Sequence, residues 1–580
     1  MRYHALATDY DGTVATDGVL DDATAAALVR LRATGRKLLL VTGRRIEDLQ
    51  TACPDLSRFD SIVAENGALL YHPASREVRL LAAPPPPELI PALRARGVDP
   101  IDAGHAIVAT WSPHDNTVLD VIRALGLELQ VIFNKGAVMV LPSGVNKASG
   151  LEAALAEMGL SPHNVVAVGD AENDHAFLAS CACAVAVANA IDSLKTRADW
   201  VTPGERGAGV TQLVDALLRD DLAELAPRLT RHDVPLGKDE ADRDVRVPAY
   251  GASVLVAGTS GGGKSTIVTG LVERMTAHGY QQCIIDPEGD YSSYEGAVVL
   301  ADAKHAPTVD EVIDVLAAPG RNVVVNLLGL PLEQRPLFAT ALLPRLLELR
   351  ARVGRPHWIV LDEAHHLLPA TWQAADPALP AQLSGMLLVT VHPKHVSPVV
   401  LRAVDQVLAT GRDPRETLDE FAAARGQTAP PLTEGQTNLA AGEGLLWAPA
   451  GGAPPARVRT IPGRGERVRH ARKYAEGELG PEESFYFRGP DDRLNLRAQN
   501  LHLFLQVAEG VDPATWLYHL RRRDYSAWVR GAIKDDTLAG EIAAIEAAAA
   551  DHAKDAEDPF ADETRRRVRA AIEAHYTAPA

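Results

Sequence analysis

The chain has 580 residues, too many for one hydrophobic core, and its length predicts about three or four domains. Its composition, 46% apolar and 23% charged, is typical of globular proteins, and no apolar run is long enough to span a membrane. The net charge of −18 argues against a broad nucleic-acid-binding surface, and the four scattered cysteines argue against a structural zinc site. The N-terminus enters an apolar strand without a basic and apolar leader, so we expect a cytoplasmic protein.

The first apolar run ends in a pair of carboxylates. Tyr3 to Thr8 has the pattern of a buried parallel strand, and Asp9-Tyr10-Asp11-Gly12-Thr13 follows it directly. A strand that ends in acids directs them toward the crevice beyond the carboxyl edge of an α/β sheet. Two carboxylates in one pocket can take different catalytic roles, because a metal can keep one of them ionised while the other acts alternately as acid and base. An Asp-x-Asp pair alone also occurs in solvated turns and helix caps, so the rest of the chain has to decide.

Three later segments place further polar residues after apolar strands or at a helix start. They are Leu38-Leu39-Leu40-Val41-Thr42-Gly43-Arg44, then Gly144-Val145-Asn146-Lys147, and finally the strand Val165 to Val168 with Gly169-Asp170-Ala171-Glu172-Asn173-Asp174 after it. In this order and spacing the four segments resemble the four motifs of the haloacid dehalogenase (HAD) superfamily. The closest resemblance is to its Cof-like sugar-phosphatase branch, and it covers about the first 220 residues.

The resemblance implies a covalent phosphatase mechanism. Asp9 would attack phosphorus and become a phosphoaspartate, which divides one difficult displacement into two easier ones. Asp11 would protonate the leaving oxygen and then deprotonate the hydrolytic water. Thr42 and Lys147 would hold the phosphoryl oxygens, where charge is spread in the transition state.

The resemblance also implies a Mg²⁺ site. Asp170 would bind the metal together with the carboxylate of Asp9 and the carbonyl of Asp11, which the HAD pattern assigns as ligands. Asn173 and Asp174 would steady Lys147 and the metal shell. For Asp174 a plain helix cap is the alternative, since Asp is a common capping residue.

Residues 83–142 predict a small α+β cap between the core segments 1–82 and 143–225. The pattern is a helix, a strand (Ile107 to Trp111), a helix (Thr117 to Leu125) and two strands joined around Asn134-Lys135-Gly136. A cap of this kind covers the pocket and excludes water. Its short length resembles the small archaeal phosphoglycolate phosphatase type, which implies a compact phosphorylated sugar or acid as substrate. The candidate substrate contacts are Gly43, Arg44, Arg45, Asn66, Asn134, Lys135 and Asn173. Alternatively, Asn66-Gly67 is only a hairpin turn and the charged residues are solvated surface groups.

Residues 226–248 mix proline with alternating charges, and we expect a linker there. A strand from Ser253 to Ala257 follows, then a glycine-rich loop and an apolar helix from Thr266. The loop reads Gly258-Thr259-Ser260-Gly261-Gly262-Gly263-Lys264-Ser265, which fits the P-loop pattern with its required strand and helix. Its amides and the helix N-terminus would cradle the phosphates of ATP, Lys264 would pair with the outer phosphates and Ser265 would bind Mg²⁺. A flexible Gly/Ser linker would explain neither the strand nor the lysine.

A second apolar strand supplies the acids that such a loop needs. His357 to Leu361 ends in Asp362, which would hold the Mg²⁺ water shell, and Glu363, which would polarise the attacking water. Together with Asp286-Pro287-Glu288-Gly289-Asp290-Tyr291, this segment resembles the HerA/FtsK-type ATPases over about Val247 to Ile461. These ATPases are usually ring-shaped motors on DNA or protein.

The chain departs from that family in several ways. It has neither a small β-barrel before the loop nor a long inserted helical bundle. Arg402 and Arg412 are the candidates for an arginine finger. His392 is placed either as a polar γ-phosphate sensor or as a structural histidine. Ring assembly is therefore less clearly implied than nucleotide binding.

A third region, 463–550, follows a Gly/Pro-rich junction and begins with His470 to Tyr474. It concentrates aromatic and basic residues on short helices and resembles a small helical module appended to other bacterial enzymes. Two interpretations are open. The aromatic residues form a small core with a basic rim, or they form a surface for nucleic acid or another anion. From Glu541 the composition predicts an Ala/Glu/Arg-rich helix and a frayed end, and we expect a helical tail over 551–580.

These patterns predict an α/β protein with a HAD Rossmann-like domain and its cap, a P-loop ATPase domain at 249–462, and a small, mostly helical C-terminal domain. We expect a Mg²⁺-dependent phosphatase for a small phosphorylated metabolite, fused to an ATP-hydrolysing domain that regulates it or is coupled to it. The ATPase domain is also expected to mediate homo-oligomerisation, and no membrane partner is expected. The alternatives are a nucleic-acid end-processing phosphatase/kinase, a DNA-associated motor and an ATP-switched assembly module.

Overall fold

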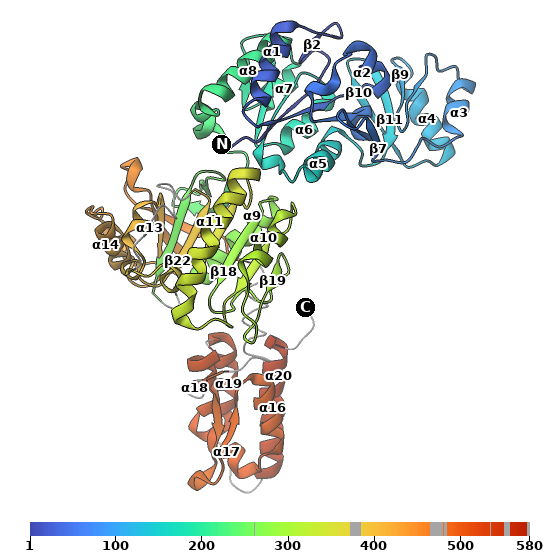
Figure 1. The fold of residues 1–580 in the computed structure, drawn as a ribbon. Coiled ribbons are helices and arrows are strands. Elements are labelled where there is room, and N and C mark those ends of the chain that lie inside the picture. Colours follow the sequence, from blue (N-terminus) through green and yellow to red (C-terminus); the bar gives the residue numbers. More distant parts are fainter. Residues whose placement is uncertain are drawn as a thin grey trace. The chain divides into compact units, whose positions relative to one another are not determined.

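The computed structural model describes residues 1–259, 262–371, 384–463, 479–480, 484–533, 535–549 and 557–576. The chain divides into two compact units, Met1–Ile461 and Pro462–Ala580, and Figure 1 shows their elements in sequence colours. In this part of the chain no helix is both long enough and apolar enough to cross a bilayer.

The first domain, described without gaps, is built on an eight-stranded sheet. In spatial order its strands are β14 (Trp200–Val201), β13 (Cys183–Ala186), β12 (Val165–Gly169), β1 (Ala5–Thr8), β4 (Lys37–Val41), β5 (Ser61–Ala64), β6 (Leu69–His72) and β7 (Glu77–Leu80). The strands from β14 to β5 run parallel, while β6 and β7 pair antiparallel. Ala5–Thr8 and Val165–Gly169 are buried throughout, as expected for parallel strands covered on both faces. The hairpin interpretation of Asn66-Gly67 is confirmed, because β5 and β6 are antiparallel neighbours on either side of it.

Helices cover this sheet and complete the Rossmann-like core. They are α1 (Asp22–Arg32), α2 (Ile46–Ala52), α5 (Lys147–Glu157), α6 (His175–Ser180), α7 (Asp192–Arg197) and α8 (Arg206–Asp220). Helix α1 packs against α8, and α5 packs against α6. A short hairpin of β2 (Ala15–Thr16) and β3 (Val19–Leu20) follows the first strand.

Residues 83–142, all of which the structure describes, form a small α+β unit of the kind expected for a cap. An antiparallel sheet has the order β10 (Leu129–Asn134), β11 (Ala137–Pro142), β9 (Val108–Trp111) and β8 (Asp102–Ala103). The helices α3 (Leu89–Ala95) and α4 (Asp115–Leu125) pack against each other, and they share an apolar core with the sheet. The cap therefore has its own small core and can hold its loops in a defined position.

The second domain contains an eleven-stranded sheet among its described residues. In spatial order the strands are β16 (Asp244–Val247), β15 (Val234–Asp239), β25 (Ala456–Thr460), β24 (Glu443–Trp447), β23 (Gln406–Thr410), β17 (Ser253–Gly258), β22 (Met386–Thr390), β21 (Trp358–Leu361), β18 (Gln282–Asp286), β20 (Val323–Asn326) and β19 (Val298–Leu300). The run from β23 to β19 is parallel, and the other four strands are antiparallel. Its helices are α9 (Lys264–Ala277), α10 (Val309–Ala317), α11 (Arg335–Val353), α12 (Ala364–Leu367), α13 (Pro398–Arg402) and α14 (Pro414–Ala424).

The prediction of a linker over 226–248 is wrong for most of that segment. Val234–Asp239 pairs with Ala456–Thr460 and with Asp244–Val247, so both segments are strands of the second sheet. The alternating charges have a structural reason: this is the edge of a sheet, where one face of each strand meets solvent and the other buries Val234, Leu236 and Val247.

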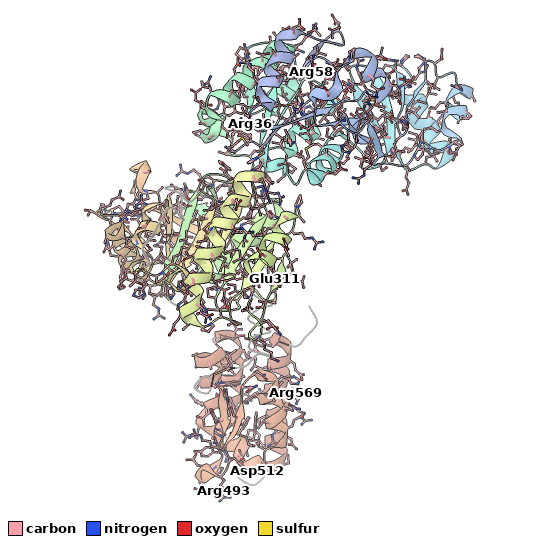
Figure 2. All side chains as sticks on the ribbon, in the orientation of Figure 1. Arg36, Arg58, Glu311, Arg493, Asp512 and Arg569 are labelled. Atoms are coloured by element: carbon pink, nitrogen blue, oxygen red, sulfur yellow. The ribbon has the colours of Figure 1, made fainter. Side chains whose placement is uncertain are left out.

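The C-terminal unit has a small aromatic core, which confirms one of the two interpretations of its aromatic residues. Phe487, Phe504, Trp516 and Tyr525 are buried against one another. Its elements are β26 (Phe485–Phe487), β27 (Leu496–Ala498), α16 (Leu501–Gly510), α17 (Pro513–Arg522), α18 (Asp524–Trp528), α19 (Asp536–Ala549) and α20 (Glu557–Tyr576). Asp512, which is labelled in Figure 2, caps α17 by accepting a hydrogen bond from Thr515 N. The segment His470 to Tyr474 lies outside the described residues.

The helix expected in the tail over 551–580 is present as α20, but this helix is packed and not a free tail. Ala561, Val568 and Ile572 are buried in the same apolar core as α17, because they form a stripe on one face of the helix. Trp516 Nε1 donates to Thr564 Oγ1 at 2.9 Å, and Arg569, labelled in Figure 2, pairs with Glu509 of α16. An Ala/Glu/Arg-rich composition concealed this narrow stripe.

Candidate functional site

Polar residues meet at the carboxyl edge of the first sheet. Asp9 follows β1, Thr42 follows the neighbouring β4, and Asp170 follows β12 on the other side. All three are buried, with at most 5% of each residue exposed. The parallel order of these strands, which the sequence did not reveal, brings together residues up to 161 positions apart.

Lys147 lies between two carboxylates in the interior. Its Nζ donates to Asp9 Oδ1 at 2.5 Å and to Asp174 Oδ1 at 2.6 Å, and 1% of its side chain is exposed. Asn146 fixes the start of α5 through a capping box, which positions the lysine. Burial disfavours the charged lysine, but Asp174 and Asp9 together more than offset this effect and raise the pKa of Lys147 above its usual value.

Three carboxylates form a candidate metal site. Oxygens of Asp9, Asp170 and Asp174 lie within 4.8 Å of one another among the described residues. Burial, the largest effect, raises the pKa of Asp9, and Asp174 and Asp170 act in the same direction while Lys147 opposes them. A buried set of carboxylate oxygens in need of positive charge fits Mg²⁺, which prefers oxygen ligands. Asp174 Oδ2 also accepts from the amides of Asp170 and Ala171, so its side chain takes part in capping the short helix Glu172–Asp174, while it makes no capping hydrogen bond to α6.

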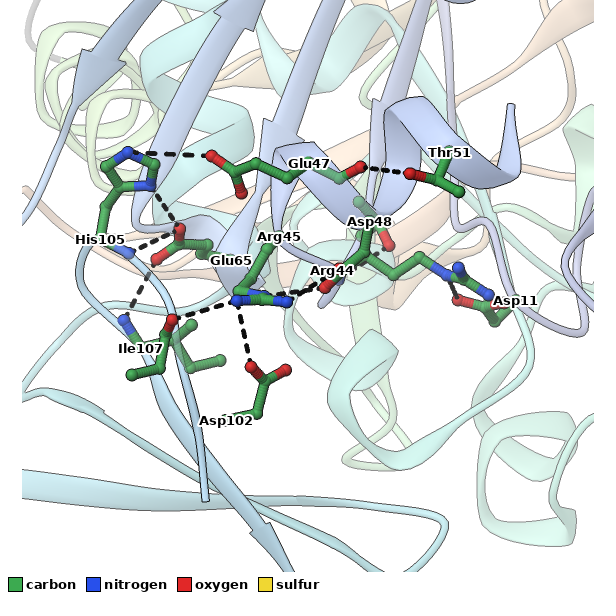
Figure 3. Close-up of polar contacts among 12 residues, drawn as sticks. Asp11, Arg44, Arg45, Glu47, Asp48, Thr51, Glu65, Asp102, His105 and Ile107 are labelled. Carbon is green, nitrogen blue, oxygen red and sulfur yellow. Dashed lines mark hydrogen bonds and ion pairs between the residues drawn. The ribbon is translucent and has the colours of Figure 1, made fainter. Parts of the chain in front are cut away.

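Asp11 is paired with an arginine at the same edge. Arg44 donates through Nε and Nη2 to the two oxygens of Asp11 at 2.6 and 2.7 Å (Figure 3). The amide of Arg44 donates to Thr42 Oγ1 at 3.1 Å. Asp11 and Arg44 are both partly exposed, so this pair stands at the opening above the buried carboxylates and not among them.

A cavity of about 460 Å³ joins core and cap at this edge. It is lined by Asp9, Asp11, Thr42, Gly43, Arg44, Arg45, Asp48 and Ala171 from the core and by Asp102, Ile107, Ala109, Trp111, Asn134, Lys135, Ala137 and Met139 from the cap. Asn66 and Asn173 are buried, and Asn173 Nδ2 donates to Asn66 Oδ1 at 3.0 Å. They support the edge from within, and direct substrate contact by either remains a prediction.

Sequence reasoning missed Glu65, which fastens the cap to the core. Its carboxylate is fully buried and accepts hydrogen bonds from the amides of His105, Ala106 and Ile107 at 2.9, 2.8 and 3.1 Å (Figure 3). His105 Nδ1 lies 3.0 Å from the same carboxylate. Nothing near Glu65 in the sequence points to partners 40 residues away, so only the fold identifies this contact.

Two other side chains connect cap and core. Arg45 binds Asp48 through two hydrogen bonds of 2.8 Å, and its Nη1 lies 3.1 Å from Asp102 Oδ1 (Figure 3). Lys135, in the turn between β10 and β11, places Nζ 2.5 Å from Asp170 Oδ2, and its amide donates to Glu172 at 3.2 Å. Gly12 allows this approach, because a Cβ there would lie 2.3 Å from Asp170 Oδ2.

The P-loop of the second domain joins β17 to α9 as predicted. Gly258, Thr259, Gly262, Gly263, Lys264, Ser265 and Thr266 are described, whereas Ser260 and Gly261 lie outside the described residues. Gly258 and Gly263 have φ values of +150° and +81°, and a Cβ on Gly258 would lie 2.0 Å from Thr410 O. Lys264 Nζ donates to the carbonyls of Gly258 and Thr259 at 2.8 and 3.2 Å. Burial lowers the pKa of Lys264, with Glu363 and Asp362 opposing.

The two acids predicted for this site lie at the end of β21. Burial, reinforced by Asp286 on the neighbouring β18, raises the pKa of Asp362 well above its usual value. Burial also raises the pKa of Glu363, whose carboxylate lies 3.3 Å from His365 Nδ1. Asp286, an additional acid, accepts from the amides of Asp290 and Tyr291 at 3.0 and 2.7 Å, and burial raises its pKa to about 6.

The remaining candidates of this domain lie elsewhere on its loops. His392 Nδ1 is 3.7 Å from Glu420 Oε2 and forms a possible metal group with Glu416 and Glu420. The amide of Arg412 lies 3.5 Å from Thr259 Oγ1, next to the P-loop. The sensor role of His392 and the finger role of Arg402 or Arg412 stay predictions.

Two segments of the chain are similar in sequence to known proteins. The family profile for haloacid dehalogenase-like hydrolase matches residues 6–83 and 120–214, and the profile for the central domain of helicase HerA matches residues 244–334. A phosphoglycolate phosphatase of Methanothermobacter thermautotrophicus is 31% identical over 220 residues, which cover 36% of this chain and 96% of that protein. The phosphoglycolate phosphatase of Halorubrum lacusprofundi is 31% identical over 207 residues, covering 34% and 89%. Among solved structures, a haloacid dehalogenase-like hydrolase from Bacteroides thetaiotaomicron matches with 21% identity and a TM-score of 0.33, over 37% of this chain and 99% of that one.

Proposed function

Because the chain belongs to the haloacid dehalogenase-like hydrolases through its first domain, we propose that this domain is a Mg²⁺-dependent phosphatase for a small, phosphoglycolate-like phosphate ester. The observation that carries the proposal is Lys147, held between Asp9 and Asp174 at a buried edge that also contains Asp170. The curated relatives, named phosphoglycolate phosphatases and covered almost completely by this chain, support the substrate class. A cavity of about 460 Å³ suits a ligand of that size.

In this mechanism Asp9 is the nucleophile. Lys147 holds one Asp9 oxygen at 2.5 Å, so the other oxygen remains available for attack on phosphorus. Lys147 and Thr42 bind the phosphoryl oxygens as charge develops on them. Asp11 gives a proton to the leaving oxygen and later takes one from water, and Arg44 positions its carboxylate at the opening of the cavity.

Asp9, Asp170 and Asp174 would hold the Mg²⁺ ion. When bound, Mg²⁺ supplies positive charge that neutralises the carboxylates and the phosphoryl group. The cap, fastened by Glu65, excludes bulk water from the covalent intermediate.

The decisive experiment is hydrolysis of a panel of phosphate esters by the purified chain in the presence of Mg²⁺. We expect phosphoglycolate to be among the best substrates, and Asp9→Asn to lower turnover by a factor of about 10⁵ or more, because the amide keeps the shape and removes the nucleophile. Retained turnover in Asp9→Asn, with circular dichroism unchanged, would exclude the phosphoaspartate mechanism.

For the second domain we propose ATP binding and hydrolysis that regulates or is coupled to the phosphatase. The match to the HerA central domain and the set of Lys264, Asp362 and Glu363 support this proposal. Coupling is supported by hydrogen bonds that join the two domains: Arg355 Nε donates to Gly159 O at 3.0 Å, and His357 Nε2 lies 3.2 Å from Asn164 Oδ1.

Lys264→Ala tests the second site. It should abolish ATP binding, measured by calorimetry, and ATPase activity, while hydrolysis of small phosphate esters continues. Loss of phosphatase activity in a folded Lys264→Ala protein would show that the phosphatase site depends on the nucleotide site.

A further inference from the structure

The cavity between core and cap contains three positively charged side chains among its described lining residues, and each has an acidic partner. Arg44 binds Asp11 through two hydrogen bonds, and Arg45 binds Asp48 in the same way. Lys135 has its ammonium on Asp170. The cavity therefore holds cations for an anionic ligand, but each must first leave a carboxylate.

Lys135 differs from the arginines in the kind of carboxylate it binds. Asp11 and Asp48 have side chains that are 45% and 42% exposed, whereas Asp170 is fully buried and belongs to the carboxylate group that fits Mg²⁺. If an arginine left its partner, no candidate metal site among the described residues would replace its charge. If Lys135 left Asp170, a divalent cation could take its place beside this carboxylate and would bring a larger positive charge.

The position of Lys135 in its turn also allows its side chain to move. It stands in the turn of the β10–β11 hairpin with φ +47°, and 48% of its side chain is exposed. Its ammonium is a compact charge on a flexible four-carbon stem with three rotatable donors, unlike the planar fork of arginine. It can therefore release Asp170 and remain within the cavity, while its amide keeps the hairpin on Glu172.

We propose that Lys135 is the residue that recognises a second anionic group of the substrate, and that a divalent cation at Asp170 sets it free to do so. The two cations share one carboxylate and repel each other, so metal binding and release of Lys135 are linked. The substrate class is then a small phosphate monoester with a carboxylate a few atoms from the phosphate. This inference rests on the proposed phosphatase function and adds the residue that selects the ester.

The first test measures metal binding without any substrate. Lys135→Met removes the charge and keeps most of the stem, and Lys37→Met is the matched control, because Lys37 pairs with Asp60 at the opposite end of β4. Calorimetric titration with Mg²⁺ should show about three- to tenfold tighter binding to Lys135→Met than to the wild type, and no change in Lys37→Met. Equal or weaker Mg²⁺ binding by a folded Lys135→Met protein overturns the proposal.

The second test compares two esters of similar size, phosphoglycolate and ethyl phosphate, of which only the first has a carboxylate. Lys135→Met should lower kcat/KM for phosphoglycolate about ten- to a hundredfold, through the lost charge-assisted hydrogen bond, and change kcat/KM for ethyl phosphate by less than about threefold. An unchanged ratio of the two values overturns the proposal. A wild type that hydrolyses neither ester would instead refute the proposed function, and the Mg²⁺ titration would still decide whether metal and lysine compete.

Discussion

Two buried lysines, one in each α/β domain, differ in the groups that surround their positive charges. Lys147 and Lys264 both begin a helix and are 1% and 7% exposed. Lys147 donates to two carboxylates, and its pKa is raised. Among the described residues Lys264 donates to two carbonyls, and burial lowers its pKa. The charge of Lys147 is therefore paired by carboxylates of its own chain before any phosphate arrives, whereas Lys264 would gain its hydrogen-bonded anions from the phosphates of a nucleotide.

This difference bears on what each domain needs in order to act. In the first domain the proposed nucleophile Asp9 and the neighbouring Asp174 lie within hydrogen-bonding distance of Lys147, and the oxygens of the candidate metal ligands of the same chain lie within 4.8 Å of one another. In the proposed function the second domain binds a nucleotide, and its resemblance to the HerA/FtsK-type ATPases implies that a neighbouring subunit completes the site. We therefore expect the first site to be independent of assembly and the second to be sensitive to it.

The largest expected effect concerns this dependence on assembly. If a finger arginine acts in trans, ATPase activity per subunit should rise with protein concentration by as much as about 10³- to 10⁵-fold, while phosphatase activity per subunit stays constant. Glu363→Gln should trap an ATP-bound assembly that is visible by light scattering. A specific ATPase rate that is flat across dilution, or a Glu363→Gln protein that stays monomeric with ATP, would exclude a ring and leave a nucleotide switch within one chain.

A pair of matched substitutions tests the charge balance itself. Lys147→Met should destabilise the first domain by about 3–5 kcal/mol, because it leaves buried carboxylates without their partner. Lys264→Met should change the stability of the second domain by less than about 1 kcal/mol, because the lost carbonyl contacts are offset by relief of a buried charge.

Hydrogen exchange of peptides from β1 and β17 along a denaturant series reports the two domains separately. Similar losses for both substitutions would show that the two lysines do not differ in the way that we infer. In the wild type, Mg²⁺ should reduce the repulsion among the carboxylates of the first site. The denaturant series is therefore measured with and without Mg²⁺.

The smallest effect concerns Glu65, a buried carboxylate that is stabilised by amides and not by a lysine. Glu65→Ala removes the acceptor of three backbone amides and should cost about 2–3 kcal/mol locally, seen as faster exchange of residues 104–107. Glu47→Ala is the control from the same cluster, because the exposed Glu47 lies 4.0 Å from His105 Nε2. Equal protection in both variants would mean that Glu65 does not hold the cap.

Much of the site was predictable because its motifs are local. Asp9 after an apolar strand, Lys147 at a helix start and the glycine-rich loop before Lys264 are short patterns whose chemistry depends on neighbouring residues. The cap was equally predictable, since its helices and strands follow clear periodicities and its hairpin turns at Lys135-Gly136. The errors arose where the local pattern was weak: the edge strands at 234–247 resemble a charged linker, and α20 shows only a narrow apolar stripe.

The sequence by itself determined which groups are present and at which strand and helix ends they stand, because strand ends and helix caps follow from residues a few positions apart. Only the tertiary structure decided their partners: Arg44 with Asp11, Lys135 with Asp170, and Glu65 with the amides of 105–107. These contacts join residues 33 to 42 positions apart, and they depend on which strands are neighbours and where the cap closes on the core. The packing of the whole sheet and the whole cap decides these pairings. A buried charge is stable only with a partner, and the packed chain determines which partner lies within reach.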